Sequence, residues 1–440
     1  MAIGFRAPTS LASKAFIIAG IVLLLLVPLL MLRGLVSERT ALREQATAKV
    51  AEGWGGDLIV GGPILTLPTL STVTDGEKTQ VIRSEIYVLP SRLTATIDLN
   101  LEEKPRYVGI YGVPVYLAGV RLAGEFDFQA LQSQLHRPGV TYLWEESRIR
   151  LPLSEVRSLR EVRRARIGVQ DISFGPSSQG PYRGIDAPVQ SFENRQPLTF
   201  EFDAVIAGTR SLSILPVGST TSVAMHSNWP HPSFQDAFLP VEHTVTDNGF
   251  DARWQVLELN RPYRQVWMQG EVSEAQLLES AFGVGLYQPV DVYQRGERAI
   301  KYALLFIALT FLTFFAWEQV SRVQLHPFQY LLVGLALSTF YLLLIALSEH
   351  IVFLLAYVIA ATALVLLIGI YIAGALHSRV RGLVAGTAMT VVYGLLYVLV
   401  LSEDYALLLG AIILFIALAA VMLVTRRIDW YRASEPVESD

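Results

Sequence analysis

The fold of this chain is decided by residues 330–376, which read YLLVGLALSTFYLLLIALSEHIVFLLAYVIAATALVLLIGIYIAGAL. Two long apolar runs, Tyr330–Leu347 and Ile351–Leu376, are separated only by the polar triplet Ser348-Glu349-His350. A helix needs about 20 mostly apolar residues to cross the hydrocarbon core of a bilayer. The stretch therefore predicts two membrane-spanning helices joined by a very short turn.

Similar apolar runs lie nearer the two ends of the chain, at residues 15–32, 302–320, 383–401 and 405–424. Together with the first two they predict six spans, one N-terminal and five C-terminal. The N-terminal run could also be a cleavable signal peptide. However, it continues through Pro28 to Leu32 and is followed by Arg33, without a small-x-small cleavage site. We therefore interpret residues 1–33 as an uncleaved signal anchor.

The charges of the connectors predict the orientation of these spans. Cytoplasmic connectors of membrane proteins carry an excess of Lys and Arg. The turns at 348–350 and 402–404 contain no Lys or Arg, whereas the connectors on the opposite side and the C-terminal tail contain Arg322, Arg379, Arg381, Arg426, Arg427 and Arg432. Both termini are therefore expected in the cytoplasm and residues 34–300 outside it, although Arg33 and Lys301 fall on the outer side.

The middle region, residues 34–300, has the composition of a soluble domain. It holds 25 Lys and Arg against 31 Asp and Glu, a net charge of −6, which argues against nucleic acid as a partner. A helical pattern over Ser37–Trp54 is followed by alternating patterns, clearest at Leu93–Leu101, that predict an antiparallel β-sandwich. A segment rich in Gly, Pro and Ser, Gly175–Pro197, could divide the region into two β units or form one long loop.

Catalytic signatures do not occur in the sequence. We find no H-E-x-x-H, P-loop, G-x-S-x-G or dinucleotide fingerprint. The chain has no cysteine, which excludes disulfides, thiolate metal sites and cysteine nucleophiles. We therefore expect a protein that is not an enzyme and that needs no cofactor or metal.

The most unusual segment of the middle region is His226-Ser227-Asn228-Trp229-Pro230-His231-Pro232-Ser233-Phe234. One reading is a metal site of His226, His231 and His243, because imidazoles suit zinc or copper. The reading that we favour is a Pro-rigid recognition loop that presents Trp229, His231 and Phe234 to a partner.

Ionisable residues also gather at the predicted outer ends of the spans. Glu349, His350, Glu403 and Asp404 lie in the turns, and Arg298 and Lys301 fall at about the same depth. Such groups can mark a proton- or cation-responsive site, or they can be the polar residues that short turns need. Elsewhere in the bundle, Glu318 is expected to reach the interface or to pair with Arg322, and Gly382 and Gly386 predict close helix packing.

Longer strings of the chain form a distinctive set. They include Arg298-Ala299-Ile300-Lys301-Tyr302 leading into 306–311, His326-Pro327-Phe328-Gln329-Tyr330, and residues 54–55, 62–63, 109–111, 114–116, 229–234, 238–240, 254–260 and 347–350. In these strings, over essentially its whole length, the chain resembles the CreD family of bacterial inner-membrane proteins. The resemblance implies a role in cell-envelope integrity, regulation by a two-component system, and tolerance to E-type colicins on overproduction. It implies no catalytic residues.

These observations predict an α+β membrane protein with six transmembrane helices and a large β-rich, sandwich-like extracytoplasmic domain. The predicted parts are a signal anchor at 1–33, a periplasmic domain at 34–300, a five-helix bundle at 301–425 and a cytoplasmic tail at 426–440. The predicted function is support of envelope integrity under stress in the inner membrane, through binding of an envelope protein or a cell-wall-related partner. The alternative is a lipid- or solute-handling carrier that uses the mouth of the bundle.

Overall fold

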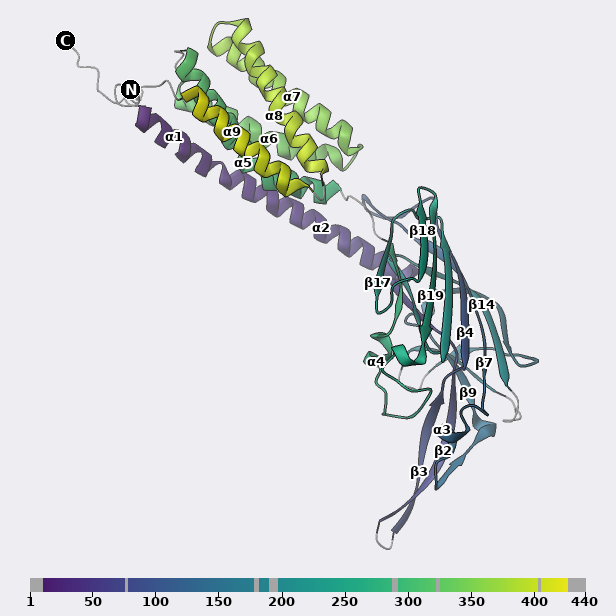
Figure 1. The fold of residues 1–440 in the computed structure, drawn as a ribbon. Helices are drawn as coiled ribbons and strands as arrows, with labels where there is room; N and C mark the ends of the chain where they lie inside the picture. The colour runs from purple at the N-terminus through teal and green to yellow at the C-terminus, as the bar shows by residue number, and fades with distance from the viewer. Residues whose placement is uncertain are drawn as a thin grey trace, which may run out of the picture. The chain divides into compact units, whose positions relative to one another are not determined.

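A computed structural model describes residues 11–75, 78–177, 182–189, 197–286, 292–321, 325–402 and 405–425. The chain divides into two compact units (Figure 1). The helical unit comprises Met1–Leu42 and Val290–Asp440, and the β-rich unit comprises Arg43–Pro289.

The helical unit consists of long apolar helices. They are α1 (Leu11–Leu24), α2 (Leu26–Trp54), which continues into the β-rich unit, α5 (Val292–Ser321), α6 (Pro327–Ser348), α7 (Phe353–Ala375), α8 (Arg379–Leu401) and α9 (Ala406–Thr425). Local signals set their ends. His326 caps α6, with Pro327 in the first turn and Gln329 completing a capping box, because this arrangement satisfies the free N–H groups of the first turn.

The number of spans differs from the prediction. Among the described residues, five helices are long and apolar enough to cross a membrane, one N-terminal and four C-terminal. The predicted sixth span forms α9, but its described apolar part, Ala406–Ala419, is shorter than the length that a crossing requires. The predicted turn between Leu347 and Ile351 is confirmed, because the N–H groups of His350 and Ile351 both donate to the carbonyl oxygen of Leu347 at 3.0 Å.

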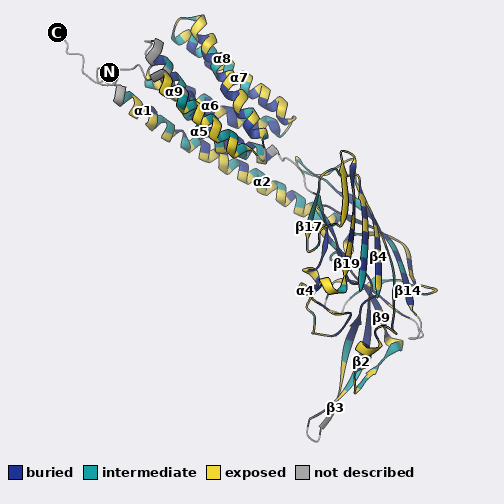
Figure 2. Ribbon diagram, viewed as in Figure 1, coloured by how far each residue is buried: buried dark blue, intermediate teal, exposed yellow. Residues whose placement is uncertain are grey.

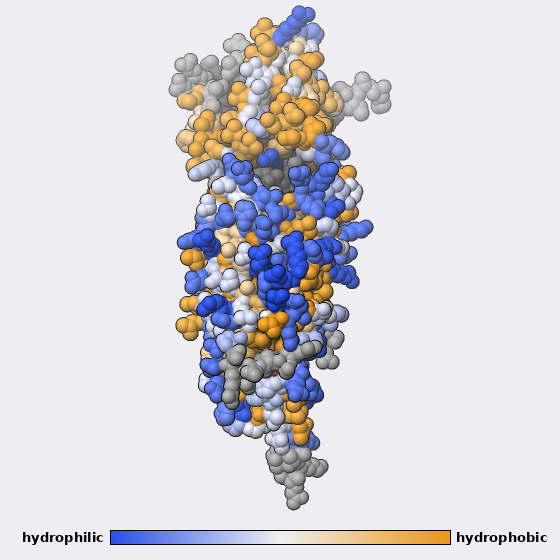
Figure 3. Space-filling model, turned by 90° about the vertical axis from the view of Figure 1, so that its right-hand side faces the viewer, coloured by the Kyte–Doolittle hydropathy of each residue, from blue (hydrophilic) through white to orange (hydrophobic). Residues whose placement is uncertain are grey.

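Helices α7 and α8 pack closely through small residues, as the glycines predicted. A Cβ atom placed on Gly382 would lie 2.6 Å from the carbonyl oxygen of Gly369, so only glycine permits this approach. Both helices carry exposed apolar residues, such as Leu355 on α7 and Leu383 on α8, and Figure 2 shows exposed positions along both. Figure 3 shows that the visible surface of the helical unit is mostly hydrophobic, whereas that of the β-rich unit is largely hydrophilic. Exposed apolar helix faces suit contact with lipid.

The described residues of the β-rich unit form several sheets. In order of pairing, the largest runs β11 (Gln170–Asp171), β10 (Leu159–Ile167), β14 (Leu198–Gly208), β7 (Tyr116–Phe126), β4 (Arg92–Leu101), β16 (Thr220–Ser227), β19 (Gly249–Leu257) and β18 (Glu242–Thr246). The second runs β12 (Gly175–Pro176), β13 (Gly184–Pro188), β9 (Arg148–Pro152), β2 (Ile64–Asp75), β3 (Lys78–Val88) and β20 (Val266–Met268), with β8 (Val140–Tyr142) beside β2.

The third sheet is smaller and runs β1 (Asp57–Gly61), β15 (Ser211–Leu215), β21 (Phe282–Leu286) and β17 (Pro232–Asp236). A separate hairpin joins β5 (Arg106–Val108) and β6 (Tyr111–Val113). The pairings are antiparallel except for β1 with β15 and β4 with β16. Short helices α3 (Gln132–Leu135) and α4 (Glu274–Leu278) and 3₁₀ turns at Trp144–Glu146, Val156–Ser158 and Glu258–Asn260 complete the unit.

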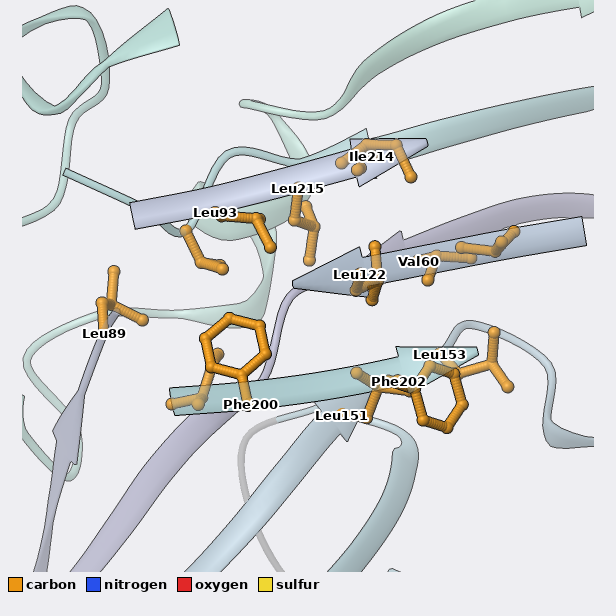
Figure 4. Packing of buried hydrophobic residues seen from close by; sticks show 14 of the residues in the cluster. Val60, Leu89, Leu93, Leu122, Leu151, Leu153, Phe200, Phe202, Ile214 and Leu215 are labelled. Carbon is orange, nitrogen blue, oxygen red and sulfur yellow. The ribbon is translucent and has the colours of Figure 1, made fainter. Parts of the chain in front are cut away.

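One hydrophobic core holds the β-rich unit together. Along β4, Leu93, Ala95, Ile97 and Leu99 are buried and the residues between them are exposed, which confirms the predicted alternation. Figure 4 shows side chains from β1, β4, β7, β9, β14 and β15 meeting in this core, including Leu93, Leu122, Leu151, Phe200 and Ile214. The core includes residues on both sides of 175–197, and β13 pairs with β9, so this segment does not separate two β units.

Candidate functional site

The segment that begins at Asn228 leaves β16 in a fixed direction. The side chain of Asn228 bonds the backbone of Leu101 twice: the N–H of Leu101 donates to Oδ1 at 2.8 Å, and Nδ2 donates to the carbonyl oxygen at 3.3 Å. The N–H of Trp229 donates to the hydroxyl of Ser227 at 3.1 Å. These bonds hold the start of the segment against the end of β4.

Trp229 and His231, two of the predicted partner-binding residues, lie side by side. The indole Nε1 of Trp229 donates to the carbonyl oxygen of His231 at 2.9 Å, and the two rings are 5.8 Å apart and perpendicular. His231 is exposed and Trp229 is half-buried. The pair is therefore fixed in one geometry while part of its surface faces solvent.

Phe234, the third predicted residue, is placed differently. Its ring lies 5.7 Å from that of Phe250, 5.9 Å from that of Trp254 and 5.2 Å from that of His243. It packs against the hydrophobic core rather than beside Trp229 and His231. The structure thus brings together two of the three residues and gives Phe234 the role of anchoring β17.

The alternative metal site is not assembled. Nδ1 of His226 lies 2.9 Å from Oδ1 of Asp251, while His231 contacts Trp229 and His243 contacts Phe234. Among the residues that the structure describes, no three His, Asp or Glu side chains are grouped so that they could hold a metal ion. The three histidines are therefore not grouped as metal ligands, although His226 on β16 and His243 on β18 line the same pocket.

A pocket of about 670 Å³ opens on the third sheet, and the same segment forms one of its walls. Asp236 adopts a left-handed backbone conformation (φ 80°), which is strained for a residue other than glycine. The Ser213 hydroxyl donates to Asp236 at 2.9 Å and the Ser211 hydroxyl donates to Asp57 at 2.8 Å. The pocket is lined by Asp57, Ile59, Arg210, Ser211, Ser213, Ser233, Asp236, Ala237, Leu278, Glu279, Ala281, Gly285 and Leu286. Its lining combines carboxylates, serine hydroxyls and the Arg210 guanidinium with apolar side chains.

Among the residues predicted at the bundle mouth, Glu349 has partners from other helices. Nε of Arg39 on α2 lies 3.6 Å from its carboxylate, and the hydroxyl of Tyr293 on α5 donates to it at 3.1 Å. The side chains of Glu349 and Arg39 are 11% and 37% exposed, so this cluster joins α2, α5 and the end of α6 in a partly buried place. Sequence reasoning did not identify Arg39, although its position near the outer end of the first predicted span was a usable signal.

Lys301, another residue of this group, has a different partner. Lys301 pairs with Glu297, one turn earlier on α5, at 3.1 Å. Arg298 lies on the same helix, and His350 lies in the turn after α6. Glu403 and Asp404 lie outside the described residues. The structure therefore assigns a partner across helices to Glu349, while Lys301 is paired within its own helix.

A second carboxylate, Glu318, has a partner that the sequence did not predict. Glu318 on α5 is 4% exposed and forms an ion pair with Lys14 on α1. It also accepts hydrogen bonds from the Tyr330 hydroxyl and from the backbone N–H of Leu325, each at 3.0 Å. The expected partner, Arg322, lies outside the described residues. Lys14 is 304 residues away in the sequence, so no local pattern could have indicated the pair.

The architecture is that of a known family of membrane proteins. The family model described as inner membrane protein CreD matches residues 10–431. The chain belongs to the CreD family. It is 35% identical to the inner membrane protein CreD of Escherichia coli (strain K12) over 426 residues, which cover 95% of this chain and 93% of that protein. The resemblance inferred from the sequence is therefore confirmed, and the chain is an inner membrane protein with several spanning helices and a large β-rich unit.

Proposed function

We propose that this CreD family member supports cell-envelope integrity without catalysis, by binding an envelope protein or a cell-wall-related partner through its β-rich unit. The observation that carries the proposal is the locked pair of Trp229 and His231. An aromatic side chain that is already fixed loses little conformational entropy when a partner binds, and such residues dominate binding energy at interfaces. The adjoining pocket, with Ser233 and Asp236 in its wall, supplies polar groups for the rim of the same contact.

We also propose that both termini lie in the cytoplasm and the β-rich unit in the periplasm. The distribution of Arg among the connectors supports this orientation. Because the chain has no cysteine, single cysteines can report it without background. A membrane-impermeant thiol reagent is expected to label Thr244→Cys in cells with a permeabilised outer membrane. Ser434→Cys is expected to react only after the inner membrane is opened, and the reverse pattern would contradict the orientation.

The binding proposal is tested by crosslinking in intact cells. A photo-reactive amino acid in place of Trp229 is expected to capture a discrete partner, whereas the same amino acid in place of His226 serves as the control. His226 is also exposed but lies on β16, paired with Asp251. The double variant Trp229→Ala, His231→Ala is expected to lose the captured partner and the colicin tolerance at normal membrane levels. Tolerance that equals the parent protein's would refute the role of the pair.

The carrier alternative receives less support from the geometry. A coupling carboxylate has to exchange partners or protons during transport. Glu349 instead joins Arg39 and Tyr293 in a partly buried cluster that links three helices, an arrangement typical of a structural tie. A Glu349→Gln variant that destabilises the helical unit but retains colicin tolerance when its level is restored would support the structural role.

A further inference from the structure

One face of the second sheet is polar and yet buried. Opposite residues of neighbouring strands place their side chains on the same face. Tyr87 lies opposite both Thr66 and Trp267, and Arg150 lies opposite Asp186. Thr66, Tyr87, Arg150 and Trp267 are each at most 2% exposed. This polar face, defined by Thr66, Tyr87, Arg148, Arg150, Asp186 and Trp267, is therefore largely buried, and only Arg148, with a side chain 45% exposed, reaches the surface.

Arg148 and Arg150 on the polar face both contact Asp186, but not equally. Arg148 donates two hydrogen bonds to Asp186, at 2.7 and 3.2 Å, while Nη2 of Arg150 lies 3.5 Å from the same carboxylate. The guanidinium groups of Arg148 and Arg150 therefore share the Asp186 carboxylate, and Arg148 makes the shorter contacts with it. Glu85 is bound by the Tyr87 hydroxyl at 2.8 Å. Arg150, with a side chain 3% exposed, therefore has the weaker of the two contacts with Asp186.

Several donors on this face have no acceptor. Nε and Nη1 of Arg150, Nε1 of Trp267 and the hydroxyls of Tyr182 and Thr66 are buried and bond to no group in the described part of the chain. The ring of Tyr87 lies 6.4 Å from that of Tyr182 and 5.9 Å from that of Trp267, so Tyr87 contacts both of these residues. Burial raises the pKa of Tyr182 above that of a free phenol, which keeps its hydroxyl protonated and able to donate.

The chemistry of these groups identifies the complementary ligand. Guanidinium and indole nitrogens only donate hydrogen bonds, and hydroxyls can also donate. A buried set of donors around a partly compensated cation is matched by an oxygen-bearing anion, through charge-assisted hydrogen bonds. A metal cation would meet these donors rather than free acceptors, so it matches this face less well than an anion does.

We propose that the polar face binds a small oxyanion, of the size of phosphate, sulfate or a single carboxylate, with Arg150 as the principal ligand residue. Trp267, Tyr182 and Thr66 donate to the remaining oxygens. The site is distinct from the Trp229–His231 pair and from the pocket on the third sheet. It does not depend on the proposed partner-binding function.

The experiment uses the full chain, purified in detergent, and follows thermal unfolding of the β-rich unit. Orthophosphate, sulfate and acetate are added at constant ionic strength, with chloride as the balancing anion. A ligand that binds only the folded state raises the Tm with a saturable dependence on its concentration. Non-specific stabilisation by sulfate or phosphate continues to rise with concentration and does not depend on Arg150. Equilibrium dialysis with radiolabelled phosphate gives the affinity directly.

Three variants decide the outcome. Arg150→Met is expected to abolish the saturable shift, and it leaves Asp186 paired with Arg148, so no buried carboxylate is stranded. Arg150→Lys is expected to weaken binding at least tenfold. The control, Arg253→Met, removes an exposed arginine of β19 and is expected to retain the full shift. No saturable shift in the parent protein, or an unchanged shift in Arg150→Met, would overturn the proposal and leave a purely structural ion pair.

A fourth variant, Trp267→Phe, tests the proposal if Arg150→Met does not fold. Trp267→Phe keeps the ring packed between Tyr87 and Tyr263 but removes the indole N–H. It is expected to fold and to bind phosphate several-fold more weakly by dialysis. Phosphate affinity equal to that of the parent protein would show that the ion binds elsewhere and would overturn the proposal.

Discussion

Removal of Lys14 tests how the first helix is attached to the others. In the Lys14→Met variant, Glu318 loses its ion-pair partner while it remains 4% exposed. Breaking a buried pair by removal of one partner costs about 3–5 kcal/mol, because a charge is left without compensation. Glu318 keeps the hydrogen bonds from Tyr330 and from the N–H of Leu325. We therefore expect the lower end, about 3 kcal/mol, which is about a hundredfold in the unfolding equilibrium.

The assay is a double-mutant cycle on the full chain. Lys14→Met, Glu318→Gln and the double variant are unfolded with a denaturing detergent, and the release of α1 is followed by fluorescence from a probe on that helix. Glu318→Gln retains an amide oxygen for Tyr330, and in the double variant no buried charge remains unpaired. The double variant should therefore be more stable than Lys14→Met, with a coupling energy of about 1–3 kcal/mol. Additive effects of the two substitutions would refute the ion pair.

Two further predictions concern the β-rich unit. Phe234→Ala is expected to lower the free energy of unfolding of this unit by about 2 kcal/mol. The loss is smaller than the ~3–5 kcal/mol typical of a fully buried Phe, because this ring is half-buried against Phe250 and Trp254. If the Phe234→Ala variant were as stable as the Trp229→Ala variant, the anchoring role of Phe234 would be contradicted. Burial raises the pKa of Tyr87, Tyr116 and Tyr182 above the usual value of about 10. The unfolded chain loses these protons near pH 10 and the folded chain keeps them, so stability is fully present below about pH 10 and falls above it. Tyrosinate absorbance should rise together with loss of β structure, and full ionisation near pH 10 with the fold intact would contradict this.

The candidate sites could be predicted only in part. Trp229 and His231 were recognisable because Pro230 and Pro232 restrict the chain around them. Phe234 looked equivalent in the sequence, and its inward position follows from the pairing of β17 with β21, which is a long-range property. Glu349 was identified by its unusual place between two apolar runs. Its partners Arg39 and Tyr293 belong to helices distant in the sequence, so composition and spacing could not reveal them.

The sequence by itself determined the kind of protein and the approximate positions of most of its membrane helices. Apolar runs, caps and turn residues are local properties, and a bilayer imposes a minimum length that can be read from the chain. The tertiary structure alone decided which charged groups meet. The pairs Lys14–Glu318 and Arg39–Glu349 and the polar face around Arg150 form between residues far apart in the chain. Their burial makes these contacts energetically significant, and burial depends on the packing of the whole fold rather than on any local pattern.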